Sequence, residues 1–503
     1  MGEIRKQAIL SGIVIYIGFG IGFVNTWLFI RNGQGYFTPA QYGLTRLFFD
    51  VGSLMFAVAS LGILPVINKF FPYYQEHLPR SKNDLFAKSL LITLTGFLLV
   101  LAGGLLFEPL IVRKFSERSE LFVEYFHWVF LFGAGILMFS VLETISISYR
   151  QSVLPNFLRE TAMRLLTMIL LFLFITQTVS FDQFISLFSF QFLAIAFILF
   201  IVLKLKKQLP LTLKPSLVTK RFKKKMFTLG SYVYGGLVIS ILSQVIDSIL
   251  IASISEKGIH DAGVYNLATY LSNLIQVPQR SIITATLPIL VLAWKNKNMS
   301  EIDRLYKRSS INLLLIGLFI FFCIWMNVSD IFDLLNIQSD YKAGMYVILI
   351  LGITKLIDAG TGINGQIIAT SSYWRFEFFT GIILVLLILP LNYILINKYG
   401  IIGSAYANLL SFSVYNLIRY LFLWKKHKIQ PFTVKTVYSI AISFLLYFIA
   451  DKLFGEMHSW SGLFIRTGFF TMFFVTVVFV FKLTPDALQL WHQFRKRFKN
   501  EAN

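Results

Sequence analysis

The chain has 503 residues, of which 56% are hydrophobic and only 14% are charged. This composition excludes an ordinary soluble protein of this length, in which about 25% of the residues would be charged. A formal net charge of +21 would suit nucleic-acid binding only if a basic soluble domain carried it, and no segment between the apolar blocks is long enough. The single cysteine, Cys323, excludes a disulfide framework within one chain, and the six scattered histidines have no metal-binding spacing.

Apolar blocks of about 20 residues or more recur along the whole chain, and each can cross a hydrocarbon core of about 30 Å as a helix. The blocks are apolar throughout, which excludes the alternating strands of a membrane barrel. The sequence therefore predicts an all-α polytopic membrane protein with about fourteen transmembrane helices. In chain order, the spans are predicted near residues 7–30, 42–67, 85–107, 121–146, 153–177, 183–204, 226–253, 262–293, 309–328, 343–370, 375–396, 401–424, 432–450 and 462–481.

The longest basic break divides these spans into two sets of six, followed by two further helices. It contains Pro210 and Pro215 and is interpreted as a linker, with a lipid-headgroup patch as the alternative. The predicted domains are an N-terminal six-helix lobe at 1–205, a basic cytoplasmic linker at 206–225, a C-terminal six-helix lobe at 226–424, helices 13 and 14 at 425–482, and an amphipathic cytoplasmic tail at 483–503.

Lysine and arginine are concentrated in alternate connections, above all at 204–225 and 295–308. Cytoplasmic loops retain positive charge, so this asymmetry places both termini in the cytoplasm. The first block is too long for a signal-peptide core and is predicted to remain as the first helix.

A faint internal repeat relates the second predicted helix to the eighth. A shift of about 223 positions aligns Tyr42 with Tyr265 and Pro65 with Pro288, which indicates a parallel duplication of the kind that transporters carry. The long block at 262–293 is predicted to tilt or kink at Pro278 or Pro288.

Charged residues within the spans are the main functional clues, because an ionisable group in hydrocarbon needs a polar cavity or a partner. Arg280 lies near the middle of its span and is predicted to be a cation that faces a cavity. Arg46 and Asp50 are four residues apart, and Lys355 and Asp358 are three apart, so each pair shares a helix face and can form an ion pair. Snorkelling to the interface is the alternative for Arg46.

Other intramembrane charges suggest ion coupling and gating. The buried carboxylates that could accept a coupling proton or sodium ion are Asp247, Asp358 and Asp50. The charged residues that could form an inner gate through ion pairs, or else simply pack helices together, are Glu143, Arg159, Glu160, Arg164 and Arg419. Arg466, one turn inside the last span, is interpreted as an interfacial anchor.

The run 358–366 is polar for a mid-membrane segment and predicts a broken helix that lines a cavity. The sequence has no phosphate-binding glycine loop, no nucleophile elbow and no extramembrane domain for a nucleotide. No catalytic residue, metal or cofactor is therefore predicted, and a transporter is favoured over an enzyme.

The layout of six, six and two helices with a basic central linker resembles the polysaccharide or O-antigen flippases of the multidrug/oligosaccharidyl-lipid/polysaccharide exporter superfamily. The segment from Tyr42 to Arg46 and on to Pro65, with its counterpart from Tyr265 to Pro288, is similar to that family as well.

The resemblance implies a V-shaped, two-lobed transporter in a bacterial inner membrane, coupled to H⁺ or Na⁺ or to no ion. It implies a polyprenyl-diphosphate-linked oligosaccharide as substrate, moved by alternating access, with membrane lipids and other polysaccharide-assembly proteins as partners. The substrate-binding cations would be Arg280, Arg46 and Lys355, and the lipid tail need not enter the protein. A drug or cation antiporter on the same scaffold and a membrane-embedded polysaccharide polymerase are the alternatives.

Overall fold

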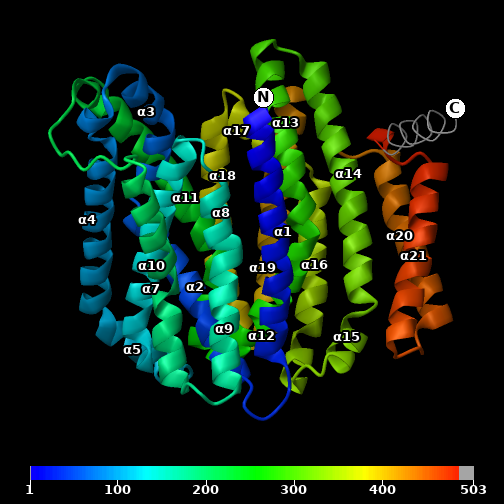
Figure 1. The fold of residues 1–503 in the computed structure, drawn as a ribbon. Helices are drawn as coiled ribbons and strands as arrows, with labels where there is room; N and C mark the ends of the chain where they lie inside the picture. The colour runs from blue at the N-terminus through cyan, green and yellow to red at the C-terminus, as the bar shows by residue number, and fades with distance from the viewer. Residues whose placement is uncertain (1, 487–503) are drawn as a thin grey trace, which may run out of the picture. The chain divides into compact units, whose positions relative to one another are not determined.

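The computed structural model of the chain describes residues 2–486, and within them the protein is entirely helical apart from its connections. Its contacts divide it into two compact units, residues 1–263 and 264–503. Thirteen of the described helical segments are long and apolar enough to cross a membrane, and each coincides with a predicted span. The predicted all-α, multi-pass fold class is confirmed (Figure 1).

The first unit contains α1 to α11 and the beginning of α12. Its helices are α1 (Gly2–Ile30), α2 (Pro39–Ala59), α3 (Ile63–His77), η1 (Arg80–Lys82), α4 (Leu85–Leu106), α5 (Glu108–Phe115), α6 (Glu120–Glu124), α7 (Phe126–Ser148), α8 (Val153–Asn156), η2 (Phe157–Ala162), α9 (Met163–Ile175), α10 (Phe181–Leu205) and α11 (Leu217–Ile254).

The second unit continues from α12 to the end of the described chain. Its helices are α12 (Ile259–Asn273), η3 (Leu274–Gln276), α13 (Val277–Lys295), α14 (Met299–Trp325), α15 (Val328–Leu334), η4 (Ser339–Gly344), α16 (Met345–Gly360), α17 (Asn364–Thr370), α18 (Trp374–Tyr399), α19 (Ile401–His427), α20 (Val434–Phe454) and α21 (Trp460–Val480).

Local sequence explains where many of these helices begin. Thr38 and Gln41 form a capping box ahead of α2, and Ser180 and Gln183 form one ahead of α10. The Ser216 hydroxyl accepts from the Thr219 backbone N–H at the start of α11. Such caps satisfy N–H groups that the first turn of a helix leaves without partners.

The predicted span at 153–177 is helical from Val153 to Ile175, but a π-helical turn, η2, interrupts it. It is therefore the one predicted span that does not coincide with one of the thirteen candidate membrane-crossing segments. The interruption carries Arg159 and Glu160. Their placement fits the general tendency of π-turns to occur where side chains must be aimed for function.

Two further predicted spans are broken near the middle. The span at 262–293 changes from α12 to α13 through the 3₁₀ turn η3, just before Pro278, which occupies the first turn of α13. The span at 343–370 stops at Gly360 and resumes at Asn364, with Gly362 in the left-handed region at φ +65°. The break predicted from the polar run 358–366 is confirmed.

The helix after the basic connection differs from the sequence-based boundaries. Residues 217–225, assigned to the linker, form the first turns of α11, and α11 packs against α2 and α3 in the first unit, although the sequence assigned it to the second lobe. One uninterrupted apolar and basic helix explains both differences, since Ser216 caps it before the lysines begin.

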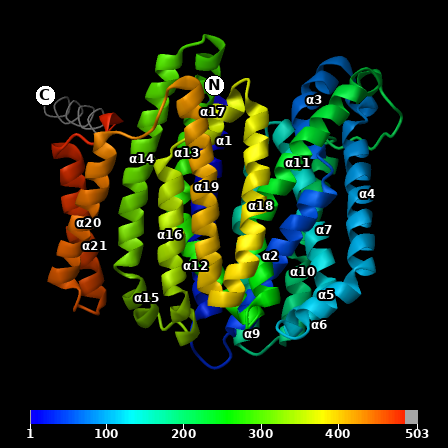
Figure 2. The same ribbon diagram turned by 180° about the vertical axis from the view of Figure 1, so that it is seen from behind.

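Within the second unit, α20 and α21 lie side by side and pack against α14 (Figures 1 and 2). Phe322 on α14 is buried with Phe470 and Phe474 of α21. The chain after α21 returns to α14, where Arg308 Nε donates to Asp486 at 2.8 Å. The rest of the predicted amphipathic tail, 487–503, lies outside the described residues.

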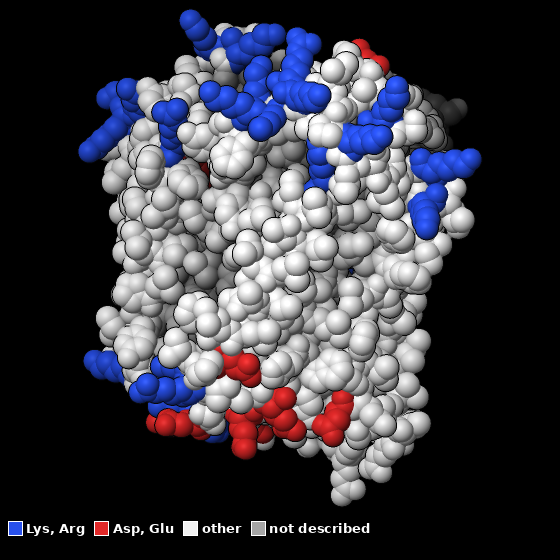
Figure 3. All heavy atoms as spheres, turned by 90° about the vertical axis from the view of Figure 1, so that its left-hand side faces the viewer, with Lys and Arg blue, Asp and Glu red and all other residues white. Residues whose placement is uncertain are grey.

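Charge is strongly segregated along the first unit. Figure 3 shows lysines and arginines gathered at one end of the face in view and acidic side chains at the other, beside a smaller basic group, with an uncharged belt between. The basic end carries the connection 206–216 and the exposed lysines at the start of α11. An uncharged belt between charged ends is the pattern expected of a membrane-spanning unit.

Candidate functional site

Two helices of the first unit bring three predicted site residues together. Arg46 and Asp50 lie on α2, and Asp247 lies on α11 with only 7% of its surface exposed. Both Arg46 and Asp247 act electrostatically on the Asp50 carboxylate, to which Ser248 hydrogen-bonds. The predicted proximity of Arg46 and Asp50 is present, and Asp247, 197 positions away in sequence, joins it.

The chemistry of this cluster suits a shared cation or proton. Two neighbouring carboxylates repel each other when both are ionised, so a bound cation or a single proton stabilises the pair. Oδ2 of Asp50 is buried and has no hydrogen-bond partner among the described residues. Arg46 is also held by Tyr42, whose hydroxyl accepts from Nε at 3.0 Å and whose ring centroid lies 5.0 Å from the guanidinium carbon.

The predicted gate residues of the first unit form two ion pairs around the π-turn η2. Arg159 donates to Glu143 of α7 at 2.6 Å, and Arg164 lies 2.9 Å from Glu160. α1 packs closely here, since a Cβ at Gly18 would lie 2.1 Å from the Glu160 carbonyl oxygen. The Glu143–Arg159 pair therefore joins α7 to the π-turn, against which α1 packs.

In the second unit, the two helix breaks meet at Asp358, close to the end of α16. Gln276, in the first break, donates to one carboxylate oxygen at 2.9 Å, and Gln279 donates to the same oxygen at 3.3 Å. Asn416 of α19 donates to the other oxygen at 3.2 Å. The Asp358 carboxylate therefore accepts from three side-chain N–H donors, one each on η3, α13 and α19.

Asn416 extends this network into the second break. Its carbonyl oxygen accepts from Thr361 Oγ1 and from Asn364 Nδ2, each at 3.0 Å. Thr361 Oγ1 also donates to the backbone carbonyl oxygen of Asp358 at 2.8 Å, a partner that a buried helix break needs because no water is there to satisfy it. Asn416 is 1% exposed and thus links the interrupted segment to α19.

Arg419, one turn beyond Asn416 on α19, pairs with Glu377 of α18. The Arg419 side chain is 8% exposed, and its guanidinium carbon lies 3.7 Å from the centroid of the Tyr415 ring. Gly365 leaves the space for this pair, since a Cβ there would lie 3.1 Å from Arg419 and 3.2 Å from Glu377.

Arg280 is an exposed cation within one of the candidate spans of this unit. It lies in the first turn of α13, directly after the break, and its side chain makes no hydrogen bond or ion pair with the residues that the structure describes. The first turn of a helix carries partial positive charge, which adds to the charge of the guanidinium. Lys355 is half-buried on α16, with Nζ 6.0 Å from the centroid of the Phe412 ring.

The sequence interpretation missed several partners and misread one residue. Glu377, Asn416, Gln276 and Ser248 are polar residues inside or at the end of apolar blocks, and no spacing rule connects them to charges on other helices. Arg466 is not an interfacial anchor: it is 2% exposed and pairs with Asp330, so it fastens α21 to α15.

The comparisons agree with this architecture. A family model described as polysaccharide biosynthesis protein matches residues 4–294. A solved structure titled as the lipid II flippase MurJ in an inward closed conformation is 15% identical, with a TM-score of 0.70 over 94% of this chain and 99% of that chain. An inward-facing multidrug MATE transporter is 16% identical, with a TM-score of 0.61 over 82% of this chain and 94% of that chain.

A solved structure of a MOP superfamily transporter from Pyrococcus furiosus, whose title reports reverse polarity of its binding pocket, is 14% identical, with a TM-score of 0.53 over 84% of this chain and 96% of that chain. No protein with a curated functional description matches the chain. The structural likenesses confirm the predicted fold, and the family model covers more than half of the sequence. The chain belongs to the polysaccharide biosynthesis protein family, and it has the multi-pass helical fold of these solved transporters.

Proposed function

We propose that this protein moves a polyprenyl-diphosphate-linked oligosaccharide across the bacterial inner membrane by alternating access. The family concerns polysaccharide biosynthesis, and one similar structure is titled as a flippase of another lipid-linked precursor, lipid II. The concentration of lysines at one end of the first unit supports cytoplasmic termini and movement from the cytoplasmic leaflet outwards.

The observation that carries the proposal is Arg280. An arginine in the middle of a long apolar segment is unfavourable unless it meets an anion, and here no described carboxylate neutralises it. A diphosphate offers charged oxygens that guanidinium groups bind strongly in a medium of low dielectric constant. Arg46 and Lys355 supply further cations in their own units.

The carboxylates then have a separate role in energy coupling. Asp50 with Asp247, and Asp358 within its amide network, would each accept a proton or sodium ion whose release drives the return of the empty transporter. The ion pairs Glu143–Arg159 and Glu160–Arg164, together with Arg419, would close the cytoplasmic side when the cavity faces outwards.

The proposal is tested by deleting the gene and following the lipid-linked glycan. Complete repeat units should accumulate on the cytoplasmic leaflet. Single units that instead reach the outer leaflet and remain unpolymerised would contradict a role in translocation.

At residue level, Arg280→Ala should abolish export in the deletion strain while the protein is still inserted in the membrane, and Arg280→Lys should retain part of it. The matched control is Arg304→Ala, because Arg304 lies on α14 and already pairs with Glu301 at 2.6 Å. Normal glycan export by the Arg280→Ala variant would rule out this residue as the diphosphate-binding cation.

One observation favours drug or cation antiport as a second candidate. The neighbouring carboxylates Asp50 and Asp247 would suit the binding of an organic cation, since acidic side chains attract cations. Protection of cells from cationic drugs by the wild-type protein, lost in Asp247→Asn but kept in Arg280→Ala, would support that function over glycolipid transport.

A further inference from the structure

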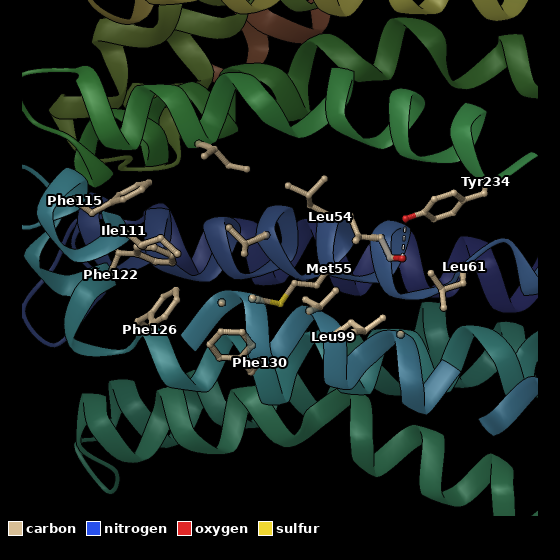
Figure 4. A pocket seen from close by; sticks show the side chains of 17 residues that line it. Leu54, Met55, Leu61, Leu99, Ile111, Phe115, Phe122, Phe126, Phe130 and Tyr234 are labelled. Atoms are coloured by element: carbon tan, nitrogen blue, oxygen red, sulfur yellow. Dashed lines mark hydrogen bonds between the residues drawn. The ribbon is translucent and has the colours of Figure 1, made fainter. Parts of the chain in front are cut away.

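An elongated groove runs along the first unit between α2, α4 and α11 (Figure 4). It encloses a cavity of about 640 Å³, within the range of about 300–1,000 Å³ that is usual for ligand sites. Its lining residues are apolar or glycine except for Tyr234. They include Met55, Leu99, Phe115, Phe126, Tyr234 and Ile249.

Close packing of α4 at one position and open space at another create the hollow. A Cβ at Gly96 would lie 2.1 Å from the Ala59 carbonyl oxygen, so α4 touches the end of α2 there. Two turns further along α4, nothing lies within 4 Å of a Cβ at Gly103, which also lines the groove. The groove is therefore a concave feature of the fold and not merely apolar surface that faces lipid.

The two ends of the groove differ in chemistry. At one end, Phe115, Phe122 and Phe126 form a row with ring centroids 5.0 and 5.9 Å apart. At the other end lie Leu61 and Tyr234, and the Tyr234 hydroxyl donates to the Val58 carbonyl oxygen at 3.1 Å (Figure 4).

The Tyr234 end leads towards the basic end of the unit. Lys225 is nine residues before Tyr234 on the same helix, which is about 14 Å along its axis. Exposed lysine and arginine side chains continue from there to Lys220. A lipid whose tail occupied the groove would therefore have its headgroup directed to a positively charged surface, which suits a phosphate.

The dimensions favour one hydrocarbon chain. The stretch of α2 that lines the groove, from Val51 to Val58, is about 11 Å long, or about a third of a hydrocarbon core of about 30 Å. A phospholipid would bring two chains to this single channel, whereas a polyprenyl phosphate brings one. We propose that the groove between α2, α4 and α11 binds the tail of the polyprenyl phosphate lipid whose glycan the protein transports, an inference that rests on the proposed function.

The groove holds the tail while the headgroup is moved, so the tail is bound to the protein and does not stay free in the bilayer. Each methylene of the tail that no longer fits in the groove lowers the affinity of the groove for the lipid by a factor of roughly four. A side chain that displaces two methylenes should therefore weaken binding about fifteenfold.

Gly103→Leu provides that side chain with little risk to folding. Leucine favours a helix over glycine, and the open space at this position accommodates its Cβ. The matched control is Gly468→Leu on α21, where nothing lies within 4 Å of a Cβ and no part of the groove is near in the sequence. Thermal unfolding of both variants verifies that each is folded.

The experiment uses the full-length protein in vesicles of zwitterionic phospholipid, with a polyprenyl phosphate that carries a photoreactive diazirine in its tail. Mass spectrometry should map the label to α4 and α11, and labelling there should fall about fifteenfold in Gly103→Leu but not in Gly468→Leu. Equal labelling of the wild type and Gly103→Leu would overturn the proposal. So would displacement of the label by phosphatidylglycerol as readily as by unlabelled polyprenyl phosphate.

Transport measured on the same vesicles separates this inference from the proposed function. Glycolipid transport by the wild-type protein without label in the groove refutes the tail site alone. Label in the groove that is sensitive to Gly103→Leu, without any transport, supports the tail site and contradicts the proposed function.

Discussion

The buried ion pair between Arg419 and Glu377 should be decisive for the stability of the second unit. Glu377→Ala leaves a guanidinium that is 8% exposed and whose Nε already has no hydrogen-bond partner in the described part of the chain. Breaking a buried pair in this way costs about 3–5 kcal/mol. Tyr415 keeps a cation–π contact worth up to about 2 kcal/mol, so we expect a loss near about 3 kcal/mol.

This loss lowers the ratio of folded to unfolded protein by a factor of roughly 150. The assay is equilibrium unfolding in detergent, with a double-mutant cycle completed by Arg419→Met and the double variant. The double variant should recover most of the loss, because two apolar side chains can replace a buried pair at little cost. The exposed pair Glu301–Arg304 is the control, and Glu301→Ala should cost less than about 1 kcal/mol. A loss below about 1 kcal/mol for Glu377→Ala, or additive effects in the cycle, would refute the reasoning.

Three further predictions concern other contacts. Gly18→Ala should separate α1 from the π-turn and lower the thermal unfolding temperature, because its Cβ would lie 2.1 Å from the Glu160 carbonyl oxygen. Gly20→Ala has open space around its Cβ and should leave that temperature unchanged. Equal effects of the two substitutions would contradict this packing. Asp358→Asn places an amide donor opposite the amide donors of Gln276 and Asn416 and should lower the free energy of unfolding by about 1–3 kcal/mol. Unfolding in denaturant measures this loss. An unchanged free energy of unfolding would show that the carboxylate does not hold the two breaks together. Burial raises the pKa of Asp330, but hydrogen bonds from His458 and Arg466 outweigh it and lower that pKa below its ordinary value near 3.8. The stability that Asp330 adds over Asp330→Asn should therefore be complete at neutral pH and disappear as the pH falls below about 3.8 through the lowered pKa; a difference that grows on acidification would reverse the assigned sign.

Much of the fold could be read from the sequence because hydrocarbon length fixes the length of each apolar block. Thirteen predicted spans coincide with candidate membrane-crossing segments, two of these spans being broken near the middle, and the fourteenth is helical with a π-turn in it. That π-turn could not be predicted, since Arg159 and Glu160 look like ordinary charges near a helix end. The polar run after Asp358, in contrast, predicted its break correctly because unsatisfied backbone in hydrocarbon needs polar partners.

Contacts within one helix could be predicted from spacing, whereas contacts between helices could not. Spacing along one helix correctly linked Arg46 to Asp50, because residues four apart share a face. It could not link Asp50 to Asp247, or Arg419 to Glu377, because those contacts depend on how separate helices pack. Asn416 escaped notice for the same reason: a single amide in an apolar helix has no pattern, although it connects Asp358 to the second break.

The proposed function is tested most directly by the movement of a fluorescent polyprenyl-diphosphate oligosaccharide between the leaflets of vesicles that contain the purified protein. Wild-type protein should move the lipid much faster than protein-free vesicles do, and Arg280→Ala should fall to the protein-free rate while Arg304→Ala keeps the wild-type rate. Wild-type protein that leaves the lipid in its original leaflet would contradict glycolipid transport, and an Arg280→Ala variant as fast as wild type would contradict the role of Arg280 in binding the diphosphate.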